Sequence, residues 1–165
     1  MSIEAGGLQV PVSVIIPAAG SGRRMGGGTA KQFLPLRGEP VLVRTVRLFI
    51  RCPLVDEIVI AAGDVEATRA LVGDMPKVAR IVKGGAERQD SVWAALQAVH
   101  SRPRIVAVHD AARPLLTPDV LEGVLRAAAT CPAQVVAVPV QDTIKQVGPD
   151  GVVVATPDRA TLWAV

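Results

Sequence analysis

The chain has 165 residues, about the size of one domain, and half of them are hydrophobic. Its net charge of +3 is too small, and its two Phe and two Trp residues are too few, for a protein that binds nucleic acid. Cys52 and Cys131 stand outside any CxxC or Cys/His pattern, which argues against a zinc site or a disulfide framework. With no signal-peptide pattern and no apolar run long enough to cross a bilayer, we expect a cytoplasmic protein without membrane contact.

Short aliphatic runs alternate with helical patterns as far as Pro139. We expect strands at 12–16, 57–61, 78–82, 105–109 and 134–139, and helices at 40–50, 64–72, 90–100 and 117–129. Asp64, Asp90 or Ser91, and Thr117 are the expected helix caps. The alternation predicts a Rossmann-like α/β fold: a mainly parallel sheet, with the strand at 105–109 near its centre and helices on both faces.

The pattern changes after Val140. Residues 142–147 and 152–156 flank a Gly148-Pro149-Asp150-Gly151 turn, which predicts an extended hairpin. No helix is expected to cover this hairpin, so we expect a projecting β-arm at 140–160 within a single domain over 1–165. The chain ends on Leu162-Trp163-Ala164-Val165 without a polar tail, and we expect the natural protein to continue beyond it.

The loop after the first strand is rich in glycine and basic residues: it carries Gly20, Gly22, Gly26, Gly27 and Gly28 with Arg23, Arg24 and Lys31. Glycines let the backbone approach a phosphate, and Arg24 and Lys31 can neutralise a triphosphate. A solvated turn is the alternative for such a loop on its own. The chain has no Gly-Lys-Ser/Thr, which excludes a Walker A loop, and Met25 stands where a dinucleotide fingerprint needs glycine.

Two further polar clusters follow predicted strands. Gly84-Gly85 leads into a polar helix start that ends at Ser91, and its backbone could hold a base or a ribose; an ordinary capped loop is the alternative. Asp110 and Arg113 follow the strand at 105–109, where Asp110 could ligate Mg²⁺ or bind a ribose hydroxyl; a surface ion pair is the alternative. His109 is interpreted as a packing residue. Ligands bind at the carboxyl ends of parallel strands, so all three loops are expected at one rim.

Together these segments resemble a known family. The stretch Pro17-Ala18-Ala19-Gly20-x-Gly22-x-Arg24-Met25, followed by Lys31-Gln32-Phe33-Leu34, is similar to the signature of 2-C-methyl-D-erythritol 4-phosphate cytidylyltransferases. Four later segments resemble the family in order and spacing: residues 88–92, 108–114, 139–145 and 158–163. The resemblance covers residues 12–165. The first loop alone indicates only the wider nucleotidyltransferase superfamily, whereas the later motifs are more specific.

The resemblance implies a nucleotidyltransferase of non-mevalonate isoprenoid precursor synthesis. The phosphate of methylerythritol phosphate would attack the α-phosphorus of CTP and release pyrophosphate, with Mg²⁺ or another divalent cation bound mainly through the CTP phosphates. Arg24, Lys31 and Arg159 would be the catalytic residues. The implied nucleotide contacts are Pro17, Ala18, Ala19, Gly20, Gly22, Gly85, Arg88 and Ser91. The implied substrate contacts are Asp110, Arg113, Thr143 and Arg159, with Asp110 also a candidate metal ligand.

The family also implies a homodimer whose arm crosses to the partner, so that Thr143 and Arg159 would act in the partner's site. Ala30 departs from the family's usual Pro before the lysine, and the family's later Thr-Pro-Gln segment, Asp and Lys lie outside this chain. A protein ending at Val165 is therefore expected to bind substrate poorly. Ribitol 5-phosphate cytidylyltransferase shares the fold and the first loop and is one alternative; a non-catalytic nucleotide-binding fragment is the other. The surroundings of Arg113 and Arg159 favour methylerythritol phosphate.

Overall fold

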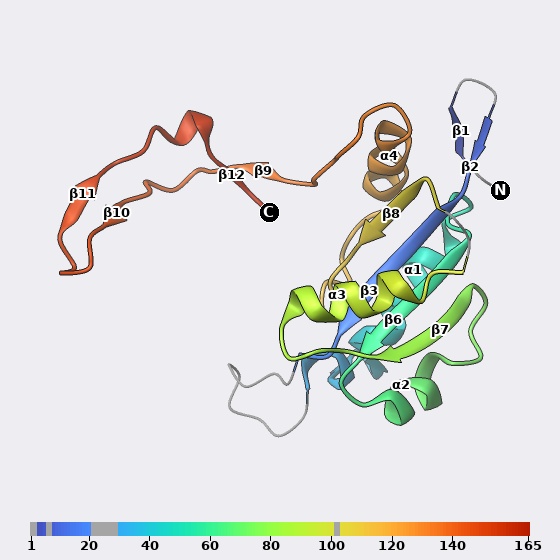
Figure 1. Ribbon diagram of the computed structural model, residues 1–165. Coiled ribbons are helices and arrows are strands. Elements are labelled where there is room, and N and C mark those ends of the chain that lie inside the picture. The colour runs from blue at the N-terminus through green and yellow to red at the C-terminus, as the bar shows by residue number, and fades with distance from the viewer. Residues whose placement is uncertain (1–2, 6–7, 21–29, 101–102) are drawn as a thin grey trace. The chain divides into compact units, whose positions relative to one another are not determined.

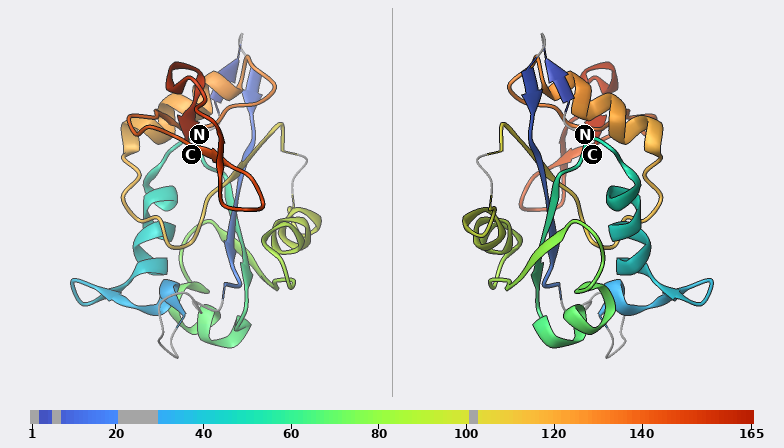
Figure 2. Two further views of the ribbon diagram at one scale, coloured as in Figure 1. Left: turned by 90° about the vertical axis from the view of Figure 1, so that its left-hand side faces the viewer. Right: turned by 90° about the vertical axis from the view of Figure 1, so that its right-hand side faces the viewer.

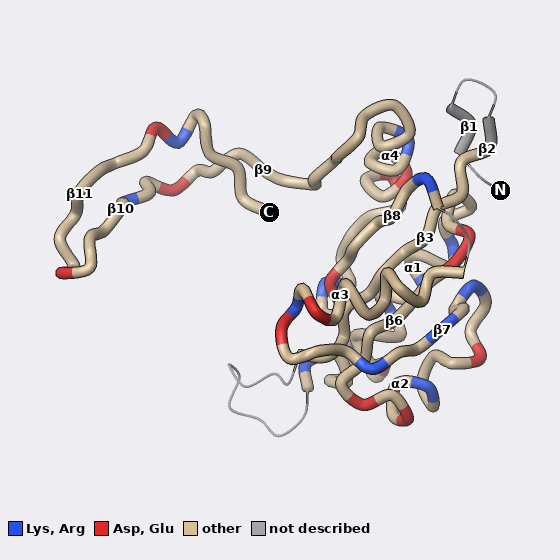
Figure 3. Tube along the Cα trace, in the orientation of Figure 1, with Lys and Arg blue, Asp and Glu red and all other residues tan. Residues whose placement is uncertain are grey.

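The computed structural model describes residues 3–5, 8–20, 30–100 and 103–165 (Figure 1). The predicted phosphate-contacting residues Gly22 and Arg24 lie outside the described residues, together with Ser21, Arg23, Met25 and Gly26–Gly28. The chain divides into two compact units, Met1–Pro132 and Ala133–Val165. Basic and acidic residues are interspersed along the trace in Figure 3.

A four-stranded parallel sheet forms the centre of the first unit. It consists of β3 (Val12–Ala18), β6 (Glu57–Ala62), β7 (Val78–Lys83) and β8 (Ile105–Val108), in the order β7-β6-β3-β8. This confirms the parallel α/β fold. The expectation that the 105–109 strand is central is wrong: β3 and β6, which are buried along almost their whole length, hold the centre, and β8 lies at the end of the order.

Four α-helices cover the sheet: α1 (Val41–Arg51), α2 (Val65–Val72), α3 (Arg88–Gln97) and α4 (Pro118–Ala128). Figure 2 shows α1 and α3 on opposite faces of the sheet. Alternate residues of β3 serve the two faces, because side chains of a strand point to opposite sides in turn. Val14 and Ile16 pack into the larger core with residues of α1 and α4, whereas Ile15 packs into a smaller core with Ala95 of α3.

The helix starts test the predicted caps. The side chain of Asp64 accepts a hydrogen bond from the Ala67 N–H, and Thr117 accepts one from Val120, so both predicted caps are confirmed. The predicted start of α3 is wrong, since the helix begins after Glu87. Glu87 and Asp90 exchange side-chain and backbone hydrogen bonds in a capping box, which places Asp90 inside the first turn.

Two short antiparallel hairpins were not predicted from the sequence. One pairs β1 (Ile3–Ala5) with β2 (Leu8–Val10), and the other pairs β4 (Pro35–Leu36) with β5 (Glu39–Pro40). The second hairpin turns at Arg37 and Gly38, whose φ angles are +52° and +80°. Strands of two or three residues are too short to show the alternation that identifies a strand in a sequence.

The second unit contains two short antiparallel pairs. The predicted hairpin is confirmed with shorter strands, β10 (Gln146–Val147) and β11 (Val153–Ala155). The predicted strand at 134–139 is wrong, since only β9 (Val138–Pro139) is extended, and it pairs with β12 (Trp163–Ala164). No residue of this unit is buried, so the unit lacks the burial that would hold a continuous apolar run in a sheet.

Within the described part of the chain, no helix has both the length and the apolar character needed to cross a membrane.

Candidate active site

Three loops meet at the carboxyl edge of the sheet and enclose a cavity of about 790 Å³. They follow β3, β7 and β8, as the sequence predicts, because parallel strands end at a common edge. The residues that line the cavity are Pro17, Ala18, Ala19, Gly20, Lys31, Gln32, Gly85, Ala86, Glu87, Arg88, Ser91, Asp110, Ala111 and Ala112. Nine of the predicted site residues are therefore gathered here: Pro17, Ala18, Ala19, Gly20, Lys31, Gly85, Arg88, Ser91 and Asp110.

Gln32 ties the lysine segment to the loop after β3. It lies in the 3₁₀ turn Lys31–Phe33, is only 5% exposed, and donates from Nε2 to the carbonyl oxygens of Ala18 at 2.7 Å and Gly20 at 3.3 Å. The neighbouring Lys31 is thereby held at the cavity wall. Sequence reasoning missed Gln32 as a site residue, because its partners are backbone carbonyls that leave no trace in a sequence.

Two glycines after β7 allow the loops to pack closely. A Cβ on Gly84 would lie 2.4 Å from Cβ of Ala19 and 2.9 Å from Oγ of Ser91. A Cβ on Gly85 would lie 2.2 Å from Cβ of Asp90. The Gly85 N–H donates to Ser91 Oγ at 3.2 Å, and the buried Ser91 hydroxyl lies 3.2 Å from the Glu87 carbonyl. The result is a tight turn with little room for any side chain larger than hydrogen at either position.

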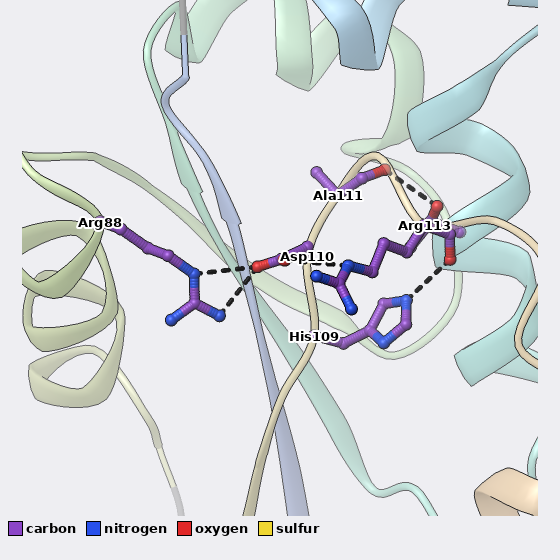
Figure 4. A network of polar contacts seen from close by, with 6 residues as sticks. Arg88, His109, Asp110, Ala111 and Arg113 are labelled. Carbon is purple, nitrogen blue, oxygen red and sulfur yellow. Dashed lines mark hydrogen bonds and ion pairs between the residues drawn. The ribbon is translucent and has the colours of Figure 1, made fainter. Parts of the chain in front are cut away.

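Asp110, which lines the cavity, links two arginines (Figure 4). Its Oδ1 accepts from Arg88 Nε at 3.0 Å and from the terminal nitrogen of Arg88 at 2.8 Å. Its Oδ2 lies 3.2 Å from Arg113 Nε. The two arginine side chains are about 60% exposed, so each pair is worth little free energy. Arg113 does not line the cavity itself, but Asp110 connects it to the wall.

His109, the residue before Asp110, packs against Phe49 of α1 and is not among the residues that line the cavity. Its ring meets that of Phe49 edge-on, with centroids 5.1 Å apart, and its Nε2 lies 2.8 Å from the Arg113 carbonyl oxygen. Burial lowers the pKa of the His109 imidazole below its usual value, although the contact with Arg113 O opposes the shift. The interpretation of His109 as a packing residue agrees with this geometry.

The remaining predicted residues lie elsewhere. Thr143 and Arg159 belong to the second unit, where Arg159 donates to the Gln141 carbonyl at 2.7 Å. Gly22 and Arg24 fall outside the described residues, which leaves Lys31 as the one predicted catalytic residue placed at the cavity. The described residues contain no group of three or more His, Cys, Asp or Glu side chains that could hold a metal ion. Asp110 offers a carboxylate, and both its oxygens face arginines.

Comparison with known proteins gives a consistent result. The family model described as "IspD: 2-C-methyl-D-erythritol 4-phosphate cytidylyltransferase" matches residues 12–165. A protein of that name from Symbiobacterium thermophilum is 92% identical over 165 residues, which are 100% of this chain and 70% of the relative. Another from Syntrophotalea carbinolica is 49% identical over 158 residues, covering 92% of this chain and 67% of the relative.

Solved structures agree with the sequence relatives. The 4-diphosphocytidyl-2C-methyl-D-erythritol synthase of Anaerococcus prevotii superposes with a TM-score of 0.80 at 26% identity, over 93% of this chain and 66% of that one. The Francisella tularensis 2-C-methyl-D-erythritol 4-phosphate cytidylyltransferase gives 0.74 at 32% identity, over 93% and 68%. The chain thus spans about two thirds of the length of the relatives it matches.

Proposed function

The chain belongs to the 2-C-methyl-D-erythritol 4-phosphate cytidylyltransferase family, and from this premise we propose that the protein joins CTP and methylerythritol phosphate into a CDP-alcohol and pyrophosphate. One observation carries the proposal for this chain: a single cavity gathers the backbone of Ala18–Gly20, the Lys31 side chain, the Gly85–Ser91 turn and Asp110. The lysine proposed to neutralise phosphate and the segment proposed to hold the nucleoside thus line the same cavity, together with Asp110.

The proposed reaction needs positioning and charge stabilisation more than it needs a base. The nucleophile is already an anionic phosphate, so no proton has to be removed before it attacks the α-phosphorus. Lys31 is proposed to stabilise the charge that builds up on the α-phosphate oxygens as the pyrophosphate bond breaks. Arg24, outside the described residues, is proposed to share in this, and so is Arg159 from the second unit of the partner subunit; Gly22 is proposed to contact the nucleotide.

The nucleoside half of the site is proposed to rely on backbone groups. Ala18, Ala19 and Gly85 have side chains too small to reach a ligand, so their peptide groups would contact the cytosine and ribose, with Pro17 and Gly20 completing the wall. Ser91 is fixed by Gly85 and Glu87, and Arg88 borders the same turn. Asp110 and Arg113 are proposed to bind the polyol phosphate, through a carboxylate for hydroxyls and a guanidinium for the phosphate, together with Thr143 and Arg159 from the second unit of a partner subunit.

A divalent cation such as Mg²⁺ would fit this arrangement only as a companion of the nucleotide. Among the described residues, Asp110 is the carboxylate proposed as a metal ligand, and two arginines compete for it. The phosphates of CTP would therefore supply most of the oxygen ligands that Mg²⁺ requires. When bound there, the ion would neutralise phosphate charge, which complements Lys31.

Turnover with defined substrates tests the proposal. The full-length protein is incubated with CTP, Mg²⁺ and either methylerythritol phosphate or ribitol 5-phosphate, and the release of pyrophosphate and CDP-alcohol is measured. We expect product with methylerythritol phosphate. Product with ribitol 5-phosphate alone would replace the proposed substrate by its alternative.

Lys31→Ala separates catalysis from simple nucleotide binding. We expect the variant to lose about 10²- to 10³-fold in kcat, the usual cost of removing one charge-stabilising group, while CTP still binds. Arg69→Ala, which removes a positive charge from an exposed ion pair on α2, is the matched control. Equal turnover in both variants would favour a non-catalytic nucleotide-binding protein.

We also propose that the protein is a homodimer formed through residues 133–165. This unit exposes many apolar side chains: Val135, Val136, Val138, Val147, Val152, Val153, Val154 and Trp163 are 47–67% exposed. A second copy of the chain is the proposed cover for them. Sedimentation of wild type against Val153→Asp tests this, and a wild-type monomer at high concentration would contradict it.

We also propose that the protein is cytoplasmic, in keeping with the free thiols of Cys52 and Cys131.

A further inference from the structure

The loop that carries Asp110 and Arg113 is held at its middle by the buried residue Ala111. Its side chain and backbone are 4% exposed. Its N–H donates to the carbonyl oxygen of Pro17 on β3 at 3.4 Å, and its own carbonyl oxygen accepts from Thr45 Oγ1 at 2.9 Å. The Ala111 residue is therefore fixed on one side by the central strand and on the other by helix α1.

Thr45 lies outside the cavity and is completely buried on α1. Its hydroxyl proton is shared, since Oγ1 lies 3.1 Å from the Val41 carbonyl oxygen as well as 2.9 Å from Ala111 O. A threonine in a helix commonly bonds the carbonyl four residues earlier, so the contact with Val41 is expected from the helix alone. The contact with Ala111 joins segments far apart in the sequence, and nothing local requires it.

A second contact from the same helix holds the start of the loop. Phe49, about one turn further along α1 than Thr45, places its ring edge-on to that of His109. His109 Nε2 in turn reaches the Arg113 carbonyl oxygen, which can only accept, so this nitrogen carries the hydrogen (Figure 4). The Arg113 N–H also bonds Asp110 O at 3.1 Å. Residues 109–113 thus form a closed turn, held by α1 at two points.

We propose that Thr45 is a positioning residue for the polyol-phosphate side of the site: by bonding the Ala111 carbonyl, it sets the place of Asp110 and Arg113. The inference rests on the proposed function. Among the described residues, the nucleotide side is bonded to this turn only through the bonds of Pro17 to Ala111 and of Arg88 to Asp110. It has contacts of its own as well, those of Gln32 with Ala18 and Gly20 and the close approach of Gly84 to Ala19. Loss of the Thr45 hydroxyl should therefore weaken the binding of the polyol phosphate and leave the binding of CTP nearly unchanged.

Three variants test this in steady-state kinetics, with each substrate varied in turn. Thr45→Val keeps the shape of the side chain and removes the donor, whereas Thr45→Ser keeps the donor. Thr68→Val is the matched control: Thr68 of α2 is equally buried and bonds the carbonyl of the N-cap Asp64 four residues earlier, but it is not among the residues that line the cavity. We expect Thr45→Val to raise KM for methylerythritol phosphate about tenfold, the cost of one unsatisfied buried carbonyl, and to change KM for CTP less than twofold.

Thr45→Ser should restore KM to within about twofold of wild type, because the serine hydroxyl can make the same bond. Thr68→Val should leave both KM values unchanged even where thermal unfolding shows that it is destabilised. The inference is overturned if Thr45→Val raises both KM values equally, or if it lowers thermal stability and leaves both KM values unchanged, as expected for Thr68→Val. It is also overturned if Thr45→Ser raises KM for methylerythritol phosphate as much as Thr45→Val does. Wild-type protein that turns over no methylerythritol phosphate would defeat the proposed function first, and this inference with it.

Discussion

At the scale of single residues, the half-buried His109 imidazole makes the stability of the first unit depend on pH. Burial is the main cause that lowers its pKa; Asp110 and the Arg113 carbonyl act in the opposite direction, and the charge of Arg113 adds to the lowering. The folded protein therefore resists protonation of a group that the unfolded chain protonates below about pH 6.5. The neutral imidazole therefore contributes to the free energy of unfolding. That contribution is complete above about pH 6.5 and is lost as the pH falls toward the lower pKa of the folded state.

We expect the free energy of unfolding to decrease, as the pH falls below about 6.5, more in wild type than in His109→Gln, which keeps an N–H donor and cannot titrate. Denaturant melts at several pH values measure this. His100→Gln is the control, because His100 is the one other histidine of the chain and is exposed, with Nδ1 3.0 Å from Arg80. Parallel pH profiles of wild type and His109→Gln would show that the imidazole contributes nothing.

The two cysteines should differ sharply in reactivity. Cys52 is 5% exposed at the end of α1, and burial raises the pKa of its thiol, while Cys131 is exposed. The thiolate is the reactive form and has to be reached by the reagent. Brief treatment of the native protein with iodoacetamide should therefore alkylate Cys131 alone, as peptide mass spectrometry would reveal. Denaturation before treatment should expose both, and equal labelling of both in the native state would contradict the burial of Cys52.

At the scale of elements, glycines at different places should respond oppositely to a methyl group. Gly84→Ala would force a Cβ against Ala19 and Ser91, so we expect it to push the loops after β3 and β7 apart, to cost about 1 to 3 kcal/mol in stability and to weaken CTP binding. Gly123, inside α4, has open space where a Cβ would stand.

Gly123→Ala should raise the free energy of unfolding by about 0.5 to 1 kcal/mol, because alanine loses less backbone entropy than glycine in a helix. Thermal melts and CTP titrations of the two variants, run side by side, give both quantities. Stabilisation by Gly84→Ala with full CTP affinity would mean that the two loops are not in the close contact described.

The elements also show which parts of the fold can be predicted from sequence. Strands β3 and β6 are continuous aliphatic runs because both faces are covered, so they are readable locally. The place of β8 is not readable, since strand order depends on pairing between distant segments. The start of α3 was missed because Asp90 and Ser91 are typical cap residues, whereas the cap is Glu87.

The candidate site also contains residues that can be predicted from the sequence and residues that cannot. Glycines and charged residues after a strand are typical of a phosphate-binding loop, so the sequence predicts that Gly85, Lys31 and Asp110 lie at one rim. Gln32 and Thr45 were not expected, because each acts through a backbone carbonyl of another segment, and any residue can supply a carbonyl. The predicted strand at 134–139 failed for a related reason: an apolar run becomes a sheet strand only where other segments bury it.

At the scale of the whole molecule, the hydrophobic core lies entirely in the first unit. Every buried residue of both core clusters precedes Pro132 in the described part of the chain, and the 133–165 unit has none. We expect a protein truncated after Pro132 to fold cooperatively, with nearly the far-ultraviolet circular dichroism that α1 to α4 require. Residues 133–165 alone should show no cooperative melt. Loss of the melting transition in the truncated protein would mean that the core depends on the second unit.

The carboxylate of Asp110 has a consequence for which ligands the cavity favours. By bridging Arg88 and Arg113, it supplies the site with a counter-ion that belongs to the chain itself. A phosphate that approaches must exchange one anionic partner for another, and for exposed pairs this exchange cancels about 0.2 to 1 kcal/mol of attraction for each arginine. Inorganic phosphate and stray nucleoside monophosphates, with few other contacts to offer, gain little from such an exchange. We expect ligands that also contact Lys31 and the Gly85 turn to keep most of their affinity, so that the bridge favours large, correctly shaped ligands over small abundant ones.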